Sequence, residues 1–255
     1  MESDSKKKRD FLLPASILIA ALLVSISLVY SVGKRAGGDD NKLTGNLVDN
    51  VKVPDSSPIN IKPISSEDHI LGDVDASVKI IEFSDLECPF CKSFHQTMQK
   101  VLENYGNKVA WVYRHYPIDQ LHSKARKEAE ASECANELGG PLGSEASNQA
   151  FWAYVDKIFE ITPSNDGLDL KQLPEIAAEI GLDKTKFEEC LASGRQAEKV
   201  EAGVRDAANA GARGTPYSIV IAKSGKKYII PGALPFNDPD PSRLSVKLIV
   251  DEALK

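Results

Sequence analysis

The stretch VKIIEFSDLECPFC, residues 78–91, decides the fold of this 255-residue chain. Its first part, residues 78–83, is rich in β-branched and aromatic residues and predicts a short strand. After a loop and the two cysteines, Phe94, Met98 and Val101 recur at the spacing of a helix face. The order strand, loop, helix therefore places the Cys88-Pro89-Phe90-Cys91 motif at the start of a helix.

That position favours redox chemistry at Cys88. Unpaired N–H groups and the helix macrodipole stabilise an anion at a helix start, and such sites lower a cysteine pKa from about 8.5 into the range of about 3.5–7.5. Pro89 suits the first helical position because it has no N–H to leave unpaired. Cys91, one turn further on, is placed to resolve a mixed disulfide. We expect the Cys88–Cys91 pair to work without a cofactor.

Two other uses of the pair are weaker. Zinc normally takes four ligands, and no second Cys-x-x-Cys or nearby Cys-His pair completes the shell unless Cys134 and Cys190 converge in space. A passive disulfide across two residues closes too short a loop to be an effective staple. The four histidines show no metal-ligand spacing, so we expect surface or packing roles for them and no metal site: His69, His95, His115 and His122.

The remainder of the chain from about residue 67 reads as mixed α and β structure. A second apolar run predicts another strand, several helical patterns follow, and two short strands precede a terminal helix. Strands at both ends with helices between them predict an α/β fold with a helical insertion. The expected ranges are strands at 109–113, 217–221 and 227–230, and helices at 121–138, 150–159, 170–180, 185–191, 196–210 and 242–254.

The amino end predicts export. Residues 11–30 carry no charge, and about 20 apolar residues form a transmembrane helix. The basic run at residues 6–9 favours a cytoplasmic tail at 1–10 and a single-pass anchor. A cleavable signal peptide is the alternative, although its apolar region is normally only about 7–15 residues long. Either reading exports the domain at 67–255, behind a Gly-, Asp-, Ser- and Pro-rich flexible linker at 31–66.

Charge argues against one class of partner. The formal net charge is −6 and the sequence pI is about 5.4. No basic stripe is available to displace counterions from a phosphate backbone, so we expect no nucleic-acid binding.

Residues 78–91 resemble the strand-to-active-site signature of the DsbA-like branch of the thioredoxin superfamily. Gly214-Thr215-Pro216 is similar to the loop in that family that contains a cis-proline. The likeness extends from about Asp68 to the end of the chain. It implies a thioredoxin-like fold with a helical insertion at about 118–195.

The resemblance also implies roles for individual residues. Pro216 is expected to be cis beside the sulfurs, with the backbone of Thr215 docking substrate peptide. Glu82 matches a buried acid that moves the proton of the resolving thiol, whereas pattern alone leaves open an edge-strand glutamate facing water. Cys134 and Cys190 are expected to form a structural disulfide in an oxidising compartment, the alternative being two separate buried thiols.

Together with the expected anchor at 11–30, the resemblance implies a membrane-anchored enzyme on the periplasmic or cell-surface side. Its expected activity is oxidation of cysteine pairs in exported proteins, followed by reoxidation through a membrane partner of the DsbB or VKOR type. One departure bears on this: Phe90 replaces the histidine of the best-known strong oxidant and adds no positive charge beside the thiolate. A disulfide reductase or isomerase, or a copper- or zinc-binding thioredoxin-fold module, therefore stays open as an alternative.

Overall fold

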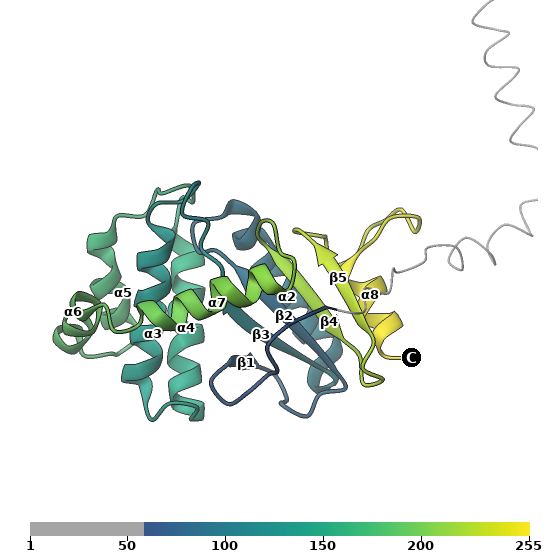
Figure 1. Ribbon diagram of the computed structural model, residues 1–255, viewed down its shortest axis with the longest axis horizontal. Helices are drawn as coiled ribbons and strands as arrows, with labels where there is room; N and C mark the ends of the chain where they lie inside the picture. Colours follow the sequence, from purple (N-terminus) through teal and green to yellow (C-terminus); the bar gives the residue numbers. More distant parts are fainter. Residues whose placement is uncertain (1–58) are drawn as a thin grey trace, which may run out of the picture. The chain divides into compact units, whose positions relative to one another are not determined.

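A five-stranded sheet in the order β1-β3-β2-β4-β5 is central to the computed structural model, which describes residues 59–255 (Figure 1). The two central strands β2 and β3 are parallel, and each of the other neighbours is antiparallel. The strands are β1 (His69–Leu71), β2 (Val78–Ser84), β3 (Val109–His115), β4 (Tyr217–Ile221) and β5 (Lys227–Pro231).

Helix α2 (Pro89–Tyr105) and a short 3₁₀ turn (Gly106–Lys108) connect the two parallel strands. The helix forms one face of the core because its buried residues recur every three or four positions. Between β3 and β4 lie five helices and a 3₁₀ turn: α3 (Ala125–Gly139), α4 (Glu145–Ile161), the 3₁₀ turn (Leu170–Gln172), α5 (Leu173–Glu179), α6 (Lys184–Ser193) and α7 (Ala197–Asn209).

Figure 1 shows α3, α4, α5 and α6 gathered at one end of the domain, with α7 running back towards the sheet. The expected insertion at about 118–195 contains α3 to α6, and the expected α/β architecture with a helical insertion is confirmed. Helix α8 (Val246–Ala253) ends the fold.

Both faces of the sheet are covered. Ile80 and Trp111 pack into the cluster formed with α2 and the insertion, whereas Ile81 and Val112 pack into a second cluster on the other face. Strands buried on both faces are read as nearly continuous apolar runs. Because side chains alternate along a strand, Glu82 lies on the same face as Ile80, inside the core.

Several boundaries differ from the sequence expectation for local reasons. The helix expected at 150–159 begins five residues earlier, where the Ser144 hydroxyl caps it, and the helix expected at 170–180 is divided into a 3₁₀ turn and α5. The helix expected from residue 121 begins at Ala125, because residues 118–122 form a turn in which the N–H groups of Leu121 and His122 donate to the carbonyl of Ile118. Helix α8 begins four residues later than expected, where the Ser245 hydroxyl caps it by accepting from the N–H of Leu248 at 3.4 Å. The three-residue strand β1 was not expected at all.

The expected tail at 1–10 and anchor at 11–30 lie outside the described residues, as does the linker up to residue 58. Within residues 59–255 we find no helix with the length and apolar character needed to span a bilayer. The end of the expected linker, residues 59–66, lies against the domain. Ile59 is buried there, and the N–H of Lys62 donates to Asp206 Oδ1 at 2.7 Å.

A disulfide joins Cys134 in α3 to Cys190 in α6, and both residues are buried. It ties the first helix of the insertion to the last one. The two cysteines are 56 residues apart in the chain, so the bond removes a long loop from the freedom of the unfolded state.

Removing this bond is expected to destabilise the domain. For the Cys134→Ala/Cys190→Ala double variant we expect the free energy of unfolding in urea to fall by about 4 kcal/mol, the loop-entropy value for a loop of this length. The control is the Cys88→Ala/Cys91→Ala variant, which also removes two sulfurs. Its free energy of unfolding is compared with that of wild type in which the active-site pair is reduced. A loss of under about 1 kcal/mol contradicts a structural role for the bond.

Candidate active site

Cys88 occupies the N-cap position of α2, and Pro89 is the first residue of the helix. The residue has extended backbone angles, and its N–H donates to the carbonyl of Asp85 at 3.1 Å, which closes a tight turn between β2 and α2. This turn holds the sulfur over the free N–H groups of the first helical turn. Cys88 is 5% exposed, so only its edge is open to solvent.

The sulfur of Cys88 is held as a thiolate. Hydrogen bonds from the Cys91 thiol and from the backbone N–H groups of Cys91 and Phe90 lower the pKa of Cys88 to about 6, even though burial acts in the opposite direction. At neutral pH most of the reduced protein therefore carries the anion that attacks and leaves in disulfide exchange.

Cys91 is fully buried and behaves in the opposite way. Burial, followed by the neighbouring Cys88 and Glu82, raises the pKa of Cys91 well above its ordinary value. Neither cysteine is part of a disulfide in the structure. The pair therefore has one sulfur that ionises easily and one that needs a base before it can attack.

Glu82 supplies a carboxyl group on the same buried face. Burial raises the pKa of Glu82 to about 7, and the Trp111 indole N–H donates to its Oε2 at 2.9 Å. Its Oε1 is buried and has no partner among the described residues. Since Glu82 lies on the central strand β2, the alternative of an edge-strand glutamate facing water is wrong. A half-ionised carboxyl beside Cys91 is suited to proton transfer.

The loop before β4 lies against the sulfurs. The Thr215–Pro216 peptide bond is cis, and the sulfur of Cys88 lies 3.5 Å from the carbonyl oxygen of Thr215. The structure thus brings together the two motifs on which the family resemblance depends. Pro216 is followed directly by β4, which pairs with β2, so the sheet itself fixes the loop beside Cys88.

Phe90 is exposed, as is Pro89 before it in the motif. Its side chain is 65% exposed, in contrast to the buried Cys88 and Cys91 on either side of it. An exposed aromatic ring next to the reactive sulfur offers an apolar contact to a client chain.

Asp85 and His122 belong to the site, although sequence analysis did not single out either as functional. Asp85 is buried, and its Oδ2 accepts from His122 Nδ1 at 2.9 Å and from the N–H of Ile118 at 2.8 Å. The N–H of Asp85 also donates to the sulfur of Cys91 at 3.4 Å. Burial opposes protonation of His122, but Asp85 and then the Cys88 thiolate raise its pKa. The ring is therefore protonated more easily than an ordinary histidine, and its protonated form adds positive charge near the thiolate.

Glu87 anchors the turn from the other side. Its carboxylate accepts from the N–H groups of Gly167 at 3.2 Å and Leu168 at 3.3 Å, and its carbonyl accepts from Asn165 at 2.8 Å. These bonds tie a loop of the insertion to the residue that precedes Cys88. Burial and the adjacent Glu87 raise the pKa of Glu128 to about 10, so Glu128 stays protonated at neutral pH.

Every histidine is buried in this structure, and each contacts a carboxylate. The sequence predicted that the histidines are surface or packing residues and fixed no acid partner for them. The structure gives each histidine an acid partner that lies far away in the chain. His95 Nε2 is 2.6 Å from Asp156 Oδ1, and His122 pairs with Asp85 as described above. His69 and His115 share Glu133.

A low-pKa sulfur at a helix start, a buried resolving thiol and an adjacent cis-proline define the class of DsbA-like thiol-disulfide oxidoreductases. The chain belongs to the thioredoxin family, since the family model described as Thioredoxin matches residues 65–229. The resemblance found in the sequence is therefore confirmed.

Solved structures give the same result. DsbA2 of Pseudomonas aeruginosa is 25% identical, with a TM-score of 0.57, and the match covers 76% of this chain and 100% of that one. Oxidised BdbD of Bacillus subtilis is similar in fold, with a TM-score of 0.60 at 21% identity over 76% of this chain and 97% of that one.

The curated relatives that the chain matches include Na(+)/H(+) antiporters. The chain is 32% identical over 149 residues to the Na(+)/H(+) antiporter NhaA 3 of Salinispora tropica, a match that covers 58% of this chain and 21% of the antiporter. The chain thus spans about a fifth of the length of the curated relatives it matches.

Substituting Glu82 tests its role in proton transfer. For Glu82→Gln we expect the rate of dithiol oxidation at neutral pH to fall about 100-fold, because the amide neither gives nor takes the proton of Cys91. The pH-rate profile is expected to lose its inflection near pH 7. Glu103→Gln, an exposed change on α2, is the control. A profile unchanged from wild type contradicts the role.

Substituting His122 tests its charge. For His122→Phe we expect the pKa of Cys88 to rise, because the thiolate loses a nearby cation, and the ultraviolet absorbance of the thiolate measures this directly. His95→Phe is the matched control, since His95 pairs with Asp156 and not with an active-site carboxylate. An equal shift in both variants, or none in His122→Phe, contradicts an electrostatic role for His122.

Proposed function

We propose that this protein is a membrane-anchored dithiol oxidase that introduces disulfides into exported proteins by exchange through Cys88. The observation that carries the proposal is the low pKa of Cys88. A thiolate that is stable at neutral pH stabilises the reduced form of the pair, and an enzyme whose reduced form is stable is a strong oxidant.

The reaction moves two electrons from the client to the enzyme. A client thiolate attacks Cys88 of the Cys88–Cys91 disulfide, Cys91 leaves as a thiolate, and the carboxyl group of Glu82 gives it a proton. The second client thiolate then attacks the client sulfur of the mixed disulfide. Cys88 leaves as a thiolate, a good leaving group because its pKa is about 6. The client now holds a disulfide, and the enzyme is a dithiol.

The backbone at Thr215 and the exposed ring of Phe90 lie where the client chain has to pass. The carbonyl of Thr215 is within 3.5 Å of the sulfur, so an extended peptide that pairs with this loop brings its cysteine to Cys88. The contacts are to backbone and to one apolar ring, which favours many clients over one sequence.

An oxidising compartment is supported by the Cys134–Cys190 disulfide, because such bonds persist outside the cytosol. Together with the uncharged run at 11–30, it supports a single-pass anchor with the tail at 1–10 in the cytoplasm and the domain outside. Turnover then needs an electron acceptor, and we propose a membrane partner of the DsbB or VKOR type. The substrates are exported proteins with cysteine pairs.

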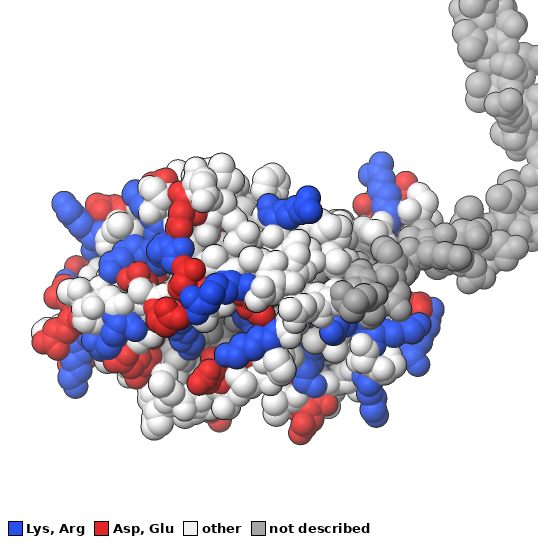
Figure 2. Space-filling model, viewed as in Figure 1, with Lys and Arg blue, Asp and Glu red and all other residues white. Residues whose placement is uncertain are grey.

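The charge pattern gives no support to a nucleic-acid partner. Figure 2 shows acidic and basic side chains interspersed over the face in view, with no continuous basic stripe. The net charge of −6 agrees with that pattern.

The reduction potential of the pair tests the proposed direction. Equilibrated against glutathione, the potential is expected to lie nearer to about −120 mV, the value of a strong oxidase, than to about −270 mV, the value of thioredoxin. Cys88→Ala is expected to abolish dithiol oxidation, whereas Cys134→Ala/Cys190→Ala keeps it. A potential near that of thioredoxin shows a reductase instead, and stoichiometric copper or zinc lost on mutation of Cys88 shows a metal-binding module.

The pH dependence of this potential follows from the pKa of Cys88. Reduction takes up two protons below this pKa and one above it, so we expect the potential to fall by about 59 mV per pH unit below pH ~6 and by about 30 mV above it. Redox titrations from pH 5 to pH 8 measure the change of slope. A single steep slope over the whole range contradicts a thiolate at neutral pH.

A further inference from the structure

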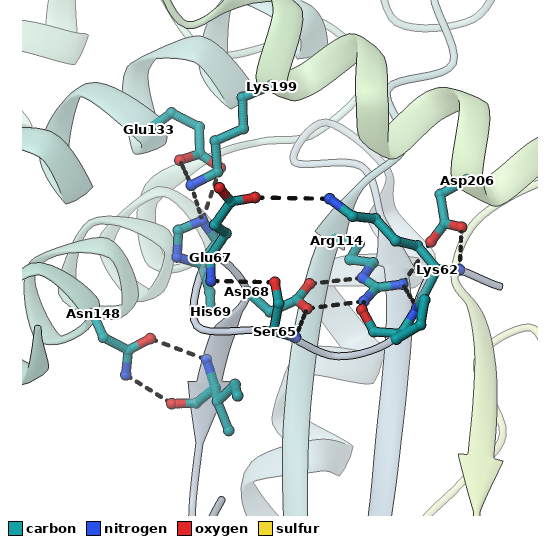
Figure 3. Close-up of polar contacts among 12 residues, drawn as sticks. Lys62, Ser65, Glu67, Asp68, His69, Arg114, Glu133, Asn148, Lys199 and Asp206 are labelled. Atoms are coloured by element: carbon teal, nitrogen blue, oxygen red, sulfur yellow. Dashed lines mark hydrogen bonds and ion pairs between the residues drawn. The ribbon is translucent and has the colours of Figure 1, made fainter. Parts of the chain in front are cut away.

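A cluster of side chains that could bind a metal ion is separate from the active-site residues around Cys88. His69 comes from the edge strand β1, His115 ends β3, and Glu133 comes from α3. All three are buried. Figure 3 shows His69, Glu133 and Lys199 of α7 pointing toward one another. None of them takes part in the exchange reaction.

The three ligand atoms fit one small ion. His69 Nε2 and His115 Nε2 lie 2.7 Å and 3.2 Å from Glu133 Oε1, and all three atoms lie within 4.8 Å of one another. In a tetrahedral zinc site with bonds of about 2.0–2.1 Å, neighbouring ligand atoms lie about 3.3 Å apart. Shifts of about 1 Å or less therefore give two nitrogens and one oxygen the spacing that zinc requires.

Glu133 is a buried acid whose carboxyl oxygens lie within 3.2 Å of nitrogens of His69, His115 and Lys199. A buried carboxylate needs a cation beside it.

Lys199 supplies that cation. Its Nζ lies 2.7 Å from Glu133 Oε2 and 3.4 Å from His69 Nε2. The second contact is poorly matched, because an N–H on His69 Nε2 that donates to Glu133 leaves no lone pair there for the ammonium. The ammonium of Lys199 thus lies close to where a metal would bind. Its contact with Glu133 is good, and its contact with His69 is poor.

Lys199 has room to leave. Its side chain is 34% exposed, and a cavity of about 760 Å³ opens beside the cluster. His69, His115, Glu133 and Lys199 all line this cavity, together with the carboxylates of Glu67 and Glu198. The cavity gives an ion a path to the buried ligands and gives the displaced ammonium room beside carboxylates, although Lys62 and Arg114 also line it.

The geometry points to a site for a divalent transition-metal ion of the zinc type, held by His69, His115 and Glu133, with water as the fourth ligand and the ammonium of Lys199 displaced into the cavity. Two imidazoles and one carboxylate suit zinc over calcium or magnesium, which prefer oxygen ligands. The site is structural in kind: it joins β1, β3 and α3, and so the sheet to the helical insertion.

Zinc and cobalt titrations of the full-length protein, solubilised in detergent with Cys88 and Cys91 oxidised to their disulfide, test the site free of competing thiols. We expect one equivalent to bind, a cobalt absorption spectrum of a tetrahedral site, and a higher melting temperature with metal. For Glu133→Gln, affinity is expected to fall by on the order of 100-fold. For Lys199→Met it is expected to rise about tenfold or more, because a competing charge is gone.

Glu137→Gln makes the same change one turn along α3 and is expected to leave affinity unchanged, since Glu137 pairs with Arg195. If Glu133→Gln fails to fold, Lys199→Met and His115→Phe still decide the matter. Absence of binding in both wild type and Lys199→Met overturns the site, and the cluster is then an ion-pair network alone. Equal affinity in wild type and His115→Phe overturns the assigned ligands. Neither result bears on the exchange reaction at Cys88.

Discussion

The chemistry of this protein depends on hydrogen bonds to one sulfur at the first turn of α2. Those bonds lower the pKa of Cys88 to about 6. Burial, and after it the neighbouring Cys88, raises the pKa of Cys91 well above its ordinary value. Glu82, with a pKa of about 7, lies between these two extremes. An attacking group, a proton carrier and a protected thiol thus share one apolar site, and each takes its protonation state from its distance to the helix start and its depth in the core.

Carboxylates hold this arrangement in place. Asp85 fixes the turn by accepting from backbone and from His122, and Glu87 binds the backbone of the insertion loop at Gly167 and Leu168. The insertion is therefore part of the active site's support as well as a cover over the sheet. Buried acids of this kind are stable only because each is either given several N–H donors or kept protonated, as Glu128 is.

Local patterns in the sequence predicted most of the fold. The strand before Cys88, the helix after it and the strand at residues 217–221 follow from hydrophobic spacing that short segments carry by themselves. The cis bond at Pro216, the role of Glu82 and the Cys134–Cys190 pairing were expected only from family resemblance. The short strand β1 and the acid partners of the histidines were missed, because they depend on contacts such as His69 with Glu133, between residues far apart in the chain.

The buried Cys134–Cys190 bond also constrains the order of events when the chain matures. With both sulfurs at 1% exposure or less, an outside oxidant has no access once α3 and α6 have closed over them. The bond has to form while the insertion is still open, and Cys88 of the same molecule is built into another part of the fold. Under the proposed function, each new copy therefore needs a donor of oxidising equivalents before it becomes one itself.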